Sequence, residues 1–117
     1  MKAQDFVAAV MQIARDRPSY RIGGSGKDGT CDCVGLIMGA VNRLERVAYP
    51  LHSSNYFARR EMATLEAAED ADLTPGMLVY KARQDTGQLN ERYKKGGSVD
   101  NGDYRDFYHV GIVCGVS

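Results

Sequence analysis

Apolar residues near the start of the chain recur at helical spacing. Phe6, Val10 and Ile13 are three or four positions apart, so they form one stripe of an amphipathic helix. This pattern predicts a helix over residues 3–15, which Pro18 ends because proline cannot continue a helix. Residues 20–30 are rich in glycine, which predicts a loop with unusual backbone angles or a close contact with another segment.

A second apolar period predicts a helix over residues 32–47. Its expected buried stripe consists of Cys33, Leu36, Ile37, Ala40, Val41 and Leu44. Asp32 is a suitable N-cap, which places Cys33 at the head of the stripe and facing inward. Gly35 and Gly39 each cost about 1 kcal/mol relative to alanine in a helix. Because they share one face, we expect another segment to pack tightly against it.

The second half of the chain predicts shorter elements. These are a short helix capped by Ser53 or Ser54 and running to residue 62, a weaker helical stretch capped by Thr64 and running to residue 72, a strand at residues 77–80 and a final strand at residues 107–116. Residues 81–106 are polar and predict a long loop or a hairpin excursion. The sequence therefore predicts an α+β fold, with N-terminal helices followed by an antiparallel sheet.

Length and charge exclude several classes of protein. The 117 residues form one domain with a single core, residues 1–117. The 15 basic and 15 acidic side chains contain no dense basic run, which disfavours binding to nucleic acid. No apolar stretch approaches the roughly 20 residues that span a bilayer, and residues 1–15 lack the apolar core of a signal peptide. We expect a soluble domain without a cofactor.

The candidate chemistry centres on a thiol. The chain has 3 cysteines, and an odd count leaves at least one of them free. Cys33, after the acidic cap Asp32, is placed as a nucleophile, and backbone N–H groups at the helix start could hold an oxyanion. A helix dipole shifts a thiol pKa by less than about one unit, so a base such as His109 must supply the rest. Tyr20 is placed to add a hydroxyl donor.

Four segments in order extend this picture. They are Tyr20 with Gly23 and Gly24, then Asp32 and Cys33 with Gly35 and Leu36, then Pro75 and Gly76 with Leu78 and Val79, and finally His109 to Ile112. In this order the chain resembles the NlpC-type cell-wall peptidases, which are papain-like cysteine hydrolases. The resemblance implies that Cys33 is the nucleophile, that His109 is the base and that Tyr20 lies in the active site.

The same resemblance implies a substrate and a setting. Enzymes of this family cut peptide bonds in the stem peptides of peptidoglycan, often next to D-glutamate. The long polar stretch before His109 resembles that of phage or prophage tail-associated members. It implies action at the cell wall, outside the cell that makes the protein, after delivery by a phage or prophage.

The sequence also departs from the family pattern. Val34 stands where the family has serine, and Met77 where it has an acidic residue. The family's third catalytic residue, a histidine, asparagine or glutamine, lies on the strand after His109, and this chain ends at Ser117. We therefore expect a truncated domain whose last strand has an exposed edge, open to self-association. A catalytically impaired or non-catalytic module for cell-wall binding or tail assembly and a papain-like amidase remain alternatives.

Three polar residues are candidates to replace the missing third residue. His52 follows a proline-containing segment and is interpreted mainly as a loop residue. Asn55 and Asn101 have no stronger support.

The remaining cysteines allow a metal-site interpretation. Cys31, Cys33 and Cys114 with His109 could bind zinc, but the C-x-C pair lacks the usual C-x-x-C spacing. The favoured interpretation has no metal, with Cys31 a loop residue near the site and Cys114 a core residue.

Overall fold

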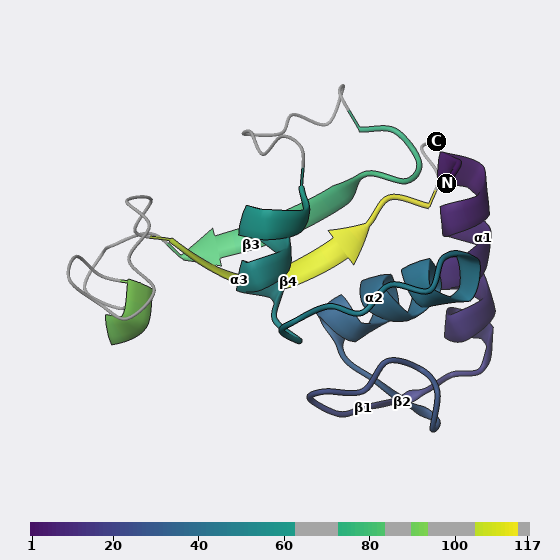
Figure 1. Cartoon of the computed structure of the whole chain (residues 1–117), viewed down its shortest axis with the longest axis horizontal. Helices are drawn as coiled ribbons and strands as arrows, with labels where there is room; N and C mark the ends of the chain where they lie inside the picture. Colours follow the sequence, from purple (N-terminus) through teal and green to yellow (C-terminus); the bar gives the residue numbers. More distant parts are fainter. Residues whose placement is uncertain (63–72, 84–89, 94–104, 115–117) are drawn as a thin grey trace.

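Two packed helices form the N-terminal part of the molecule (Figure 1). The structure is a computed structural model that describes residues 1–62, 73–83, 90–93 and 105–114. Helix α1 (Ala3–Arg15) confirms the predicted helix and buries Phe6, Val10 and Ile13. Helix α2 (Cys33–Leu44) packs on α1 and begins where predicted, but it ends at Leu44, which is 41% exposed and not part of the buried stripe.

The glycine-rich segment between these helices contains a small sheet that the sequence did not predict. Strands β1 (Ser19–Tyr20) and β2 (Thr30–Cys31) pair in parallel. The loop between them turns back through Gly23, Gly26 and Gly29, all with positive φ angles, which confirms the prediction of unusual backbone angles. The two strands are very short and lie in a segment whose composition is typical of loops. Their pairing therefore leaves no recognisable pattern in the sequence.

A short helical segment connects α2 to the second half of the chain. Ser53 caps helix α3 (Ser54–Tyr56), since its side chain accepts a hydrogen bond from the Tyr56 N–H, as predicted. The chain then continues as a π-helix, η1 (Phe57–Glu61). A short 3₁₀ helix, η3 (Glu91–Tyr93), lies within the stretch that was predicted to be loop.

Strands β3 (Leu78–Arg83) and β4 (Asp106–Ile112) form an antiparallel pair. The predicted antiparallel pairing is confirmed, although β3 extends three residues beyond the predicted strand, into the expected loop. The register pairs Lys81 with His109 and Ala82 with Phe107, so Tyr108 is an extra residue in a β-bulge.

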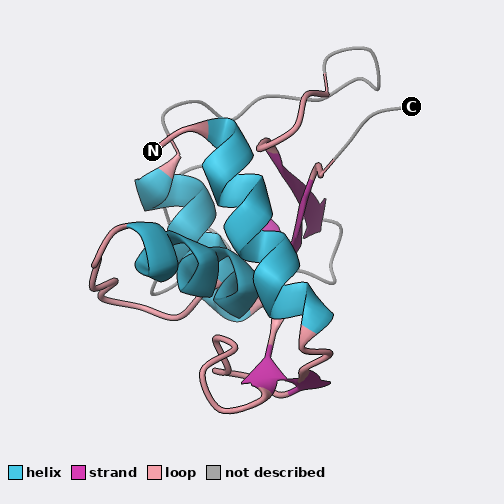
Figure 2. Cartoon of the chain, turned by 90° about the vertical axis from the view of Figure 1, so that its right-hand side faces the viewer, coloured by secondary structure: helices cyan, strands magenta, loops and turns pink. Residues whose placement is uncertain are grey.

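The resulting architecture is α+β. Helix α2 lies between α1 and the β3–β4 pair, and the β1–β2 pair lies at one end of the helices (Figures 1 and 2). One apolar cluster joins these layers, with Ile13 from α1, Ile37 from α2 and Val110 from β4. Within the described ranges, no helix is long and apolar enough to cross a membrane. The predicted stretch beginning at Thr64, Asn101 and the end of the last predicted strand lie outside the described residues.

Candidate functional site

Asp32 organises the start of α2. Its carboxylate accepts a hydrogen bond from the Gly35 N–H at 2.6 Å, which confirms Asp32 as the N-cap, and another from the Gly23 N–H at 2.8 Å. His52 Nε2 lies 2.8 Å from both carboxylate oxygens. Asp32 is only 8% exposed, so this acidic group is buried and its lone pairs are satisfied by three separate segments.

His52 is the site residue that the sequence analysis undervalued. It lies in a loop, as predicted, yet its imidazole reaches across to the residue next to Cys33. The two partners are 20 positions apart in the sequence. No local sequence pattern predicts a contact between residues so far apart. The one signal in the sequence that could have drawn attention to His52 is that histidine is rare in this chain.

The glycines of α2 allow the loop to approach the helix closely. A Cβ atom on Gly35 would lie 1.8 Å from the Gly24 carbonyl oxygen, and one on Gly39 would lie 2.2 Å from the Ser25 carbonyl oxygen. Neither position could hold a larger residue without moving the backbone. The prediction that another segment packs on this face is confirmed, and that segment is the glycine-rich loop.

Cys33 is the first residue of α2 and is half-buried, so it faces the core less completely than predicted. Its thiol packs against the main apolar cluster. The N–H groups of Cys33 and Val34 donate to no backbone acceptor in the described part of the chain, whereas the Gly35 N–H is used by the cap. The helix start therefore offers two backbone donors beside the thiol.

Tyr80 on β3 faces the same interior as Cys33. Its hydroxyl oxygen is buried and has no hydrogen-bond partner among the described residues. Burial and, to a smaller extent, the negative charge of an ionised Cys33 raise the pKa of Tyr80 well above its ordinary value. Tyr80 is therefore a neutral phenol at all physiological pH values.

His109 lies on the other face of the β3–β4 pair. The inner face carries Val110, which is buried, and Phe107, which packs edge-on against Tyr80. Because of the bulge, both Tyr108 and His109 are exposed, and Arg83 stacks on the Tyr108 ring on that outer face. The structure does not bring the imidazole to the thiol, and no side-chain hydrogen bond joins them among the described residues.

The other predicted residues are scattered. Tyr20 is 74% exposed on β1, where its backbone pairs with Cys31. Asn55 is buried, but it accepts a hydrogen bond from the Phe107 N–H and donates one to Asp106, which gives it a structural role in holding β4.

The other two cysteines differ from expectation. Cys31 is a buried strand residue, and burial, together with the charges of Asp32 and Cys33, raises its thiol pKa. Cys114 is exposed, so the prediction of a core residue is wrong, because the chain leaves β4 two residues earlier. Within the described residues, no group of three or more acidic, cysteine or histidine side chains is arranged to hold a metal ion.

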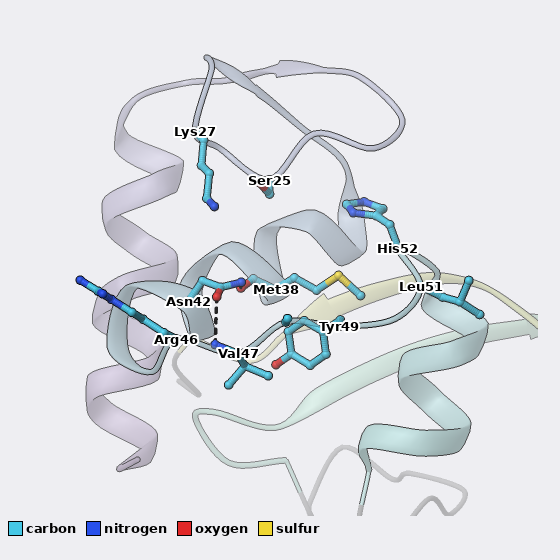
Figure 3. Close-up of a pocket in the computed structure, with 10 residues that line it drawn as sticks. Ser25, Lys27, Met38, Asn42, Arg46, Val47, Tyr49, Leu51 and His52 are labelled. Atoms are coloured by element: carbon cyan, nitrogen blue, oxygen red, sulfur yellow. Dashed lines mark hydrogen bonds between the residues drawn. The ribbon is translucent and has the colours of Figure 1, made fainter.

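A cavity of about 490 Å³ adjoins His52 (Figure 3). Its walls come from the glycine-rich loop, from one side of α2 and from residues 46–52. Ser25 and Lys27 lie on one side of the cavity, with Met38 and Tyr49 on the other. Burial, followed by the carboxylates of Glu61 and Glu45, raises the pKa of Tyr49.

In comparisons with known proteins, the chain matches no family model, no curated protein and no solved structure.

Proposed function

We propose that this chain is a cysteine endopeptidase with a papain-like core that cuts peptide bonds in peptidoglycan stem peptides. The observation that carries the proposal is the position of Cys33, at the first residue of a capped helix with two backbone donors beside it. A half-buried thiol in this position is accessible to a peptide and close to groups that stabilise negative charge.

The proposed reaction has two steps. His109 takes the thiol proton, and the Cys33 sulfur attacks the scissile carbonyl carbon while the N–H groups of Cys33 and Val34 hold the oxyanion. The C–N bond then breaks, which leaves a thioester on Cys33, and the leaving amine takes the proton from the imidazolium of His109. Water, deprotonated by the same imidazole, then releases the acid product and restores the thiol. Asp32 acts as the cap that keeps this helix start in place.

His109 must reach the inner face for this role. The bulge at Tyr108 is the point at which the register changes, and a one-residue shift in register turns a side chain to the opposite face of a sheet. If His109 instead of Tyr108 were the extra residue of the bulge, the His109 side chain would turn to the inner face. Phe107 and Val110 would remain on that face. The proposal requires the free chain to populate that arrangement already, before substrate binds.

A second candidate function is a non-catalytic module that binds cell-wall peptide or docks in a tail-like assembly. The exposed position of His109, on the face away from Val110, favours it. It predicts binding of stem peptide without turnover.

The deciding experiment measures the rate of Cys33 alkylation by iodoacetamide against pH. The background is the Cys31→Ser/Cys114→Ser variant, in which Cys33 is the sole thiol. The proposed enzyme should titrate at least one pH unit below the free-thiol value of about 8.5, and His109→Ala should abolish this shift. A titration near the free value, unaffected by His109→Ala, would favour the non-catalytic module.

Hydrolysis of a purified stem peptide provides the second readout. Cys33→Ala should abolish product formation while the circular dichroism spectrum is unchanged, whereas Cys114→Ser should retain full activity. Product formation by Cys33→Ala would rule out the proposed nucleophile.

A further inference from the structure

Two adjoining cavities lie between the glycine-rich loop and the C-terminal half of α2. The larger one, of about 490 Å³, adjoins His52, and the smaller one, of about 280 Å³, extends toward Arg43. Ser25, Lys27, Asn42 and Arg46 line both of them, so they form one continuous cleft. Cys33 does not line either cavity, and the cleft is therefore separate from the proposed catalytic site.

The walls of the cleft are held in place by the fold. Asn42 joins α2 to the segment of residues 46–52, since its side chain accepts a hydrogen bond from the Val47 N–H (Figure 3). The same side chain also donates to the Met38 carbonyl within α2. At the other end, the His52 contact with Asp32 fastens the same segment to the start of α2. A cleft with fixed walls binds a ligand without the entropic cost of ordering a loop.

The charge of the cleft is positive. Lys27 and Arg46 line both cavities and Arg43 lines the smaller one, while none of the described lining residues is Asp or Glu. Within the described ranges, neither Lys27 nor Arg46 forms an ion pair with a carboxylate. Unpaired cations in a concave site attract a negatively charged group.

The larger cavity also has an apolar part. Met38, Val47, Tyr49 and Leu51 contribute to its lining. A volume of this size lies within the usual range for small-molecule sites, which combine apolar walls with a few polar groups.

We propose that this cleft is a binding site for a small ligand that joins a carboxylate or phosphate group to an apolar body. The anionic group lies between Lys27 and Arg46, and the apolar body packs on Met38 and Tyr49. The site does not depend on turnover at Cys33, so it stands or fails independently of the proposed function.

The test is a titration of the full-length chain followed by backbone amide NMR shifts. Three probes share an aromatic body: phenyl phosphate, phenylacetate and neutral benzyl alcohol. We expect the anionic probes to shift the amides of Ser25, Asn42 and Val47 and to bind at least fivefold more tightly than benzyl alcohol. Because phenyl phosphate carries more negative charge than phenylacetate at neutral pH, the two affinities are compared at high salt, and the anion that binds more tightly there is the better match to the site.

Charge removal provides the control. Lys27→Gln/Arg46→Gln should weaken the anionic probe at least tenfold, whereas Arg21→Gln, an exposed cation in the same loop that lines neither cavity, should have no effect. Binding to the wild-type chain should also weaken as salt rises, because screening reduces the attraction. Equal binding of benzyl alcohol and the anions, or no shift with any probe, would overturn the proposal.

Discussion

The two regions that meet at Cys33 are built in different ways. On the loop side, residues 19–32 are fastened to the start of α2 by hydrogen bonds to Asp32 and by glycine contacts closer than any side chain would permit. On the sheet side, β3 and β4 meet α2 through apolar side chains such as Val110, and the buried Tyr80 hydroxyl has no partner in the part of the chain that the structure describes. Specific contacts fix the conformation of the loop side, whereas the sheet side retains the unsatisfied Tyr80 hydroxyl and a bulge.

This difference separates the features that place the thiol from those that would place the base. Features that place the thiol are rigid, because each of them is held by several independent contacts. The features that would place the base depend on the strand register, where a shift by one residue reverses a side chain. Substitutions on the loop side should therefore have larger effects on stability than substitutions on the sheet side.

Gly35→Ala should have the largest effect. The new methyl group would overlap the Gly24 carbonyl, so the loop must separate from the helix, and we expect a loss of at least about 3 kcal/mol in the free energy of unfolding. Urea denaturation measures this. The matched control is Gly111→Ala on β4, where a Cβ atom meets nothing within 4 Å and the change should stay within about 0.5 kcal/mol.

Asp32→Ala should have the next largest effect. It removes the helix cap and leaves the Gly23 N–H and His52 without their partner, for an expected loss of about 2–3 kcal/mol. Asp32→Asn keeps an acceptor for the Gly35 N–H and should lose only about 1 kcal/mol. Equal losses in the two variants, measured by urea denaturation, would show that the cap contributes little.

Tyr80→Phe tests the sheet side and should act in the opposite direction. Removing a buried hydroxyl without a partner eliminates its desolvation cost, so stability should rise by about 1 kcal/mol. Thermal unfolding provides the measurement. The control is Tyr49→Phe, because the Tyr49 hydroxyl is not a buried group that lacks a partner. This variant should change stability by less than about 0.5 kcal/mol. A destabilised Tyr80→Phe would mean that the hydroxyl has a stabilising contact.

The smallest expected effect concerns alkaline pH. The pKa of Tyr80 is raised in the folded chain, so above about pH 10 the unfolded chain loses this proton first and stability falls as pH rises. In Tyr80→Phe this contribution is absent, and the decline between about pH 10 and 11 should be shallower. Tyr49 and Cys31 contribute equally to both proteins, so the difference between the two pH profiles isolates Tyr80. Parallel profiles would contradict the assignment.

The sequence predicted the features that arise from neighbouring residues. The α1 stripe, the Asp32 cap and the Ser53 cap each depend on spacings of a few positions, and the structure has all of them. The close packing on Gly35 also followed from the cost of glycine in a helix.

Other features depend on distant parts of the chain and were not predictable in the same way. The contact between His52 and Asp32 joins segments that no local pattern connects. The bulge that exposes His109 depends on how β3 and β4 align, since a shift of one residue preserves the composition of the strand but changes its faces. The exposure of Cys114 follows from where β4 ends.

The contact between the loop and α2 also restricts how this sequence can vary. Any side chain at Gly35 or Gly39 would collide with a backbone carbonyl, which cannot rotate away as a flexible side chain can. We therefore expect natural variants of this chain to keep glycine at both positions and to accept alanine or serine at Gly111. In a saturation library selected for folding, substitutions at Gly35 and Gly39 should be nearly absent from the surviving clones.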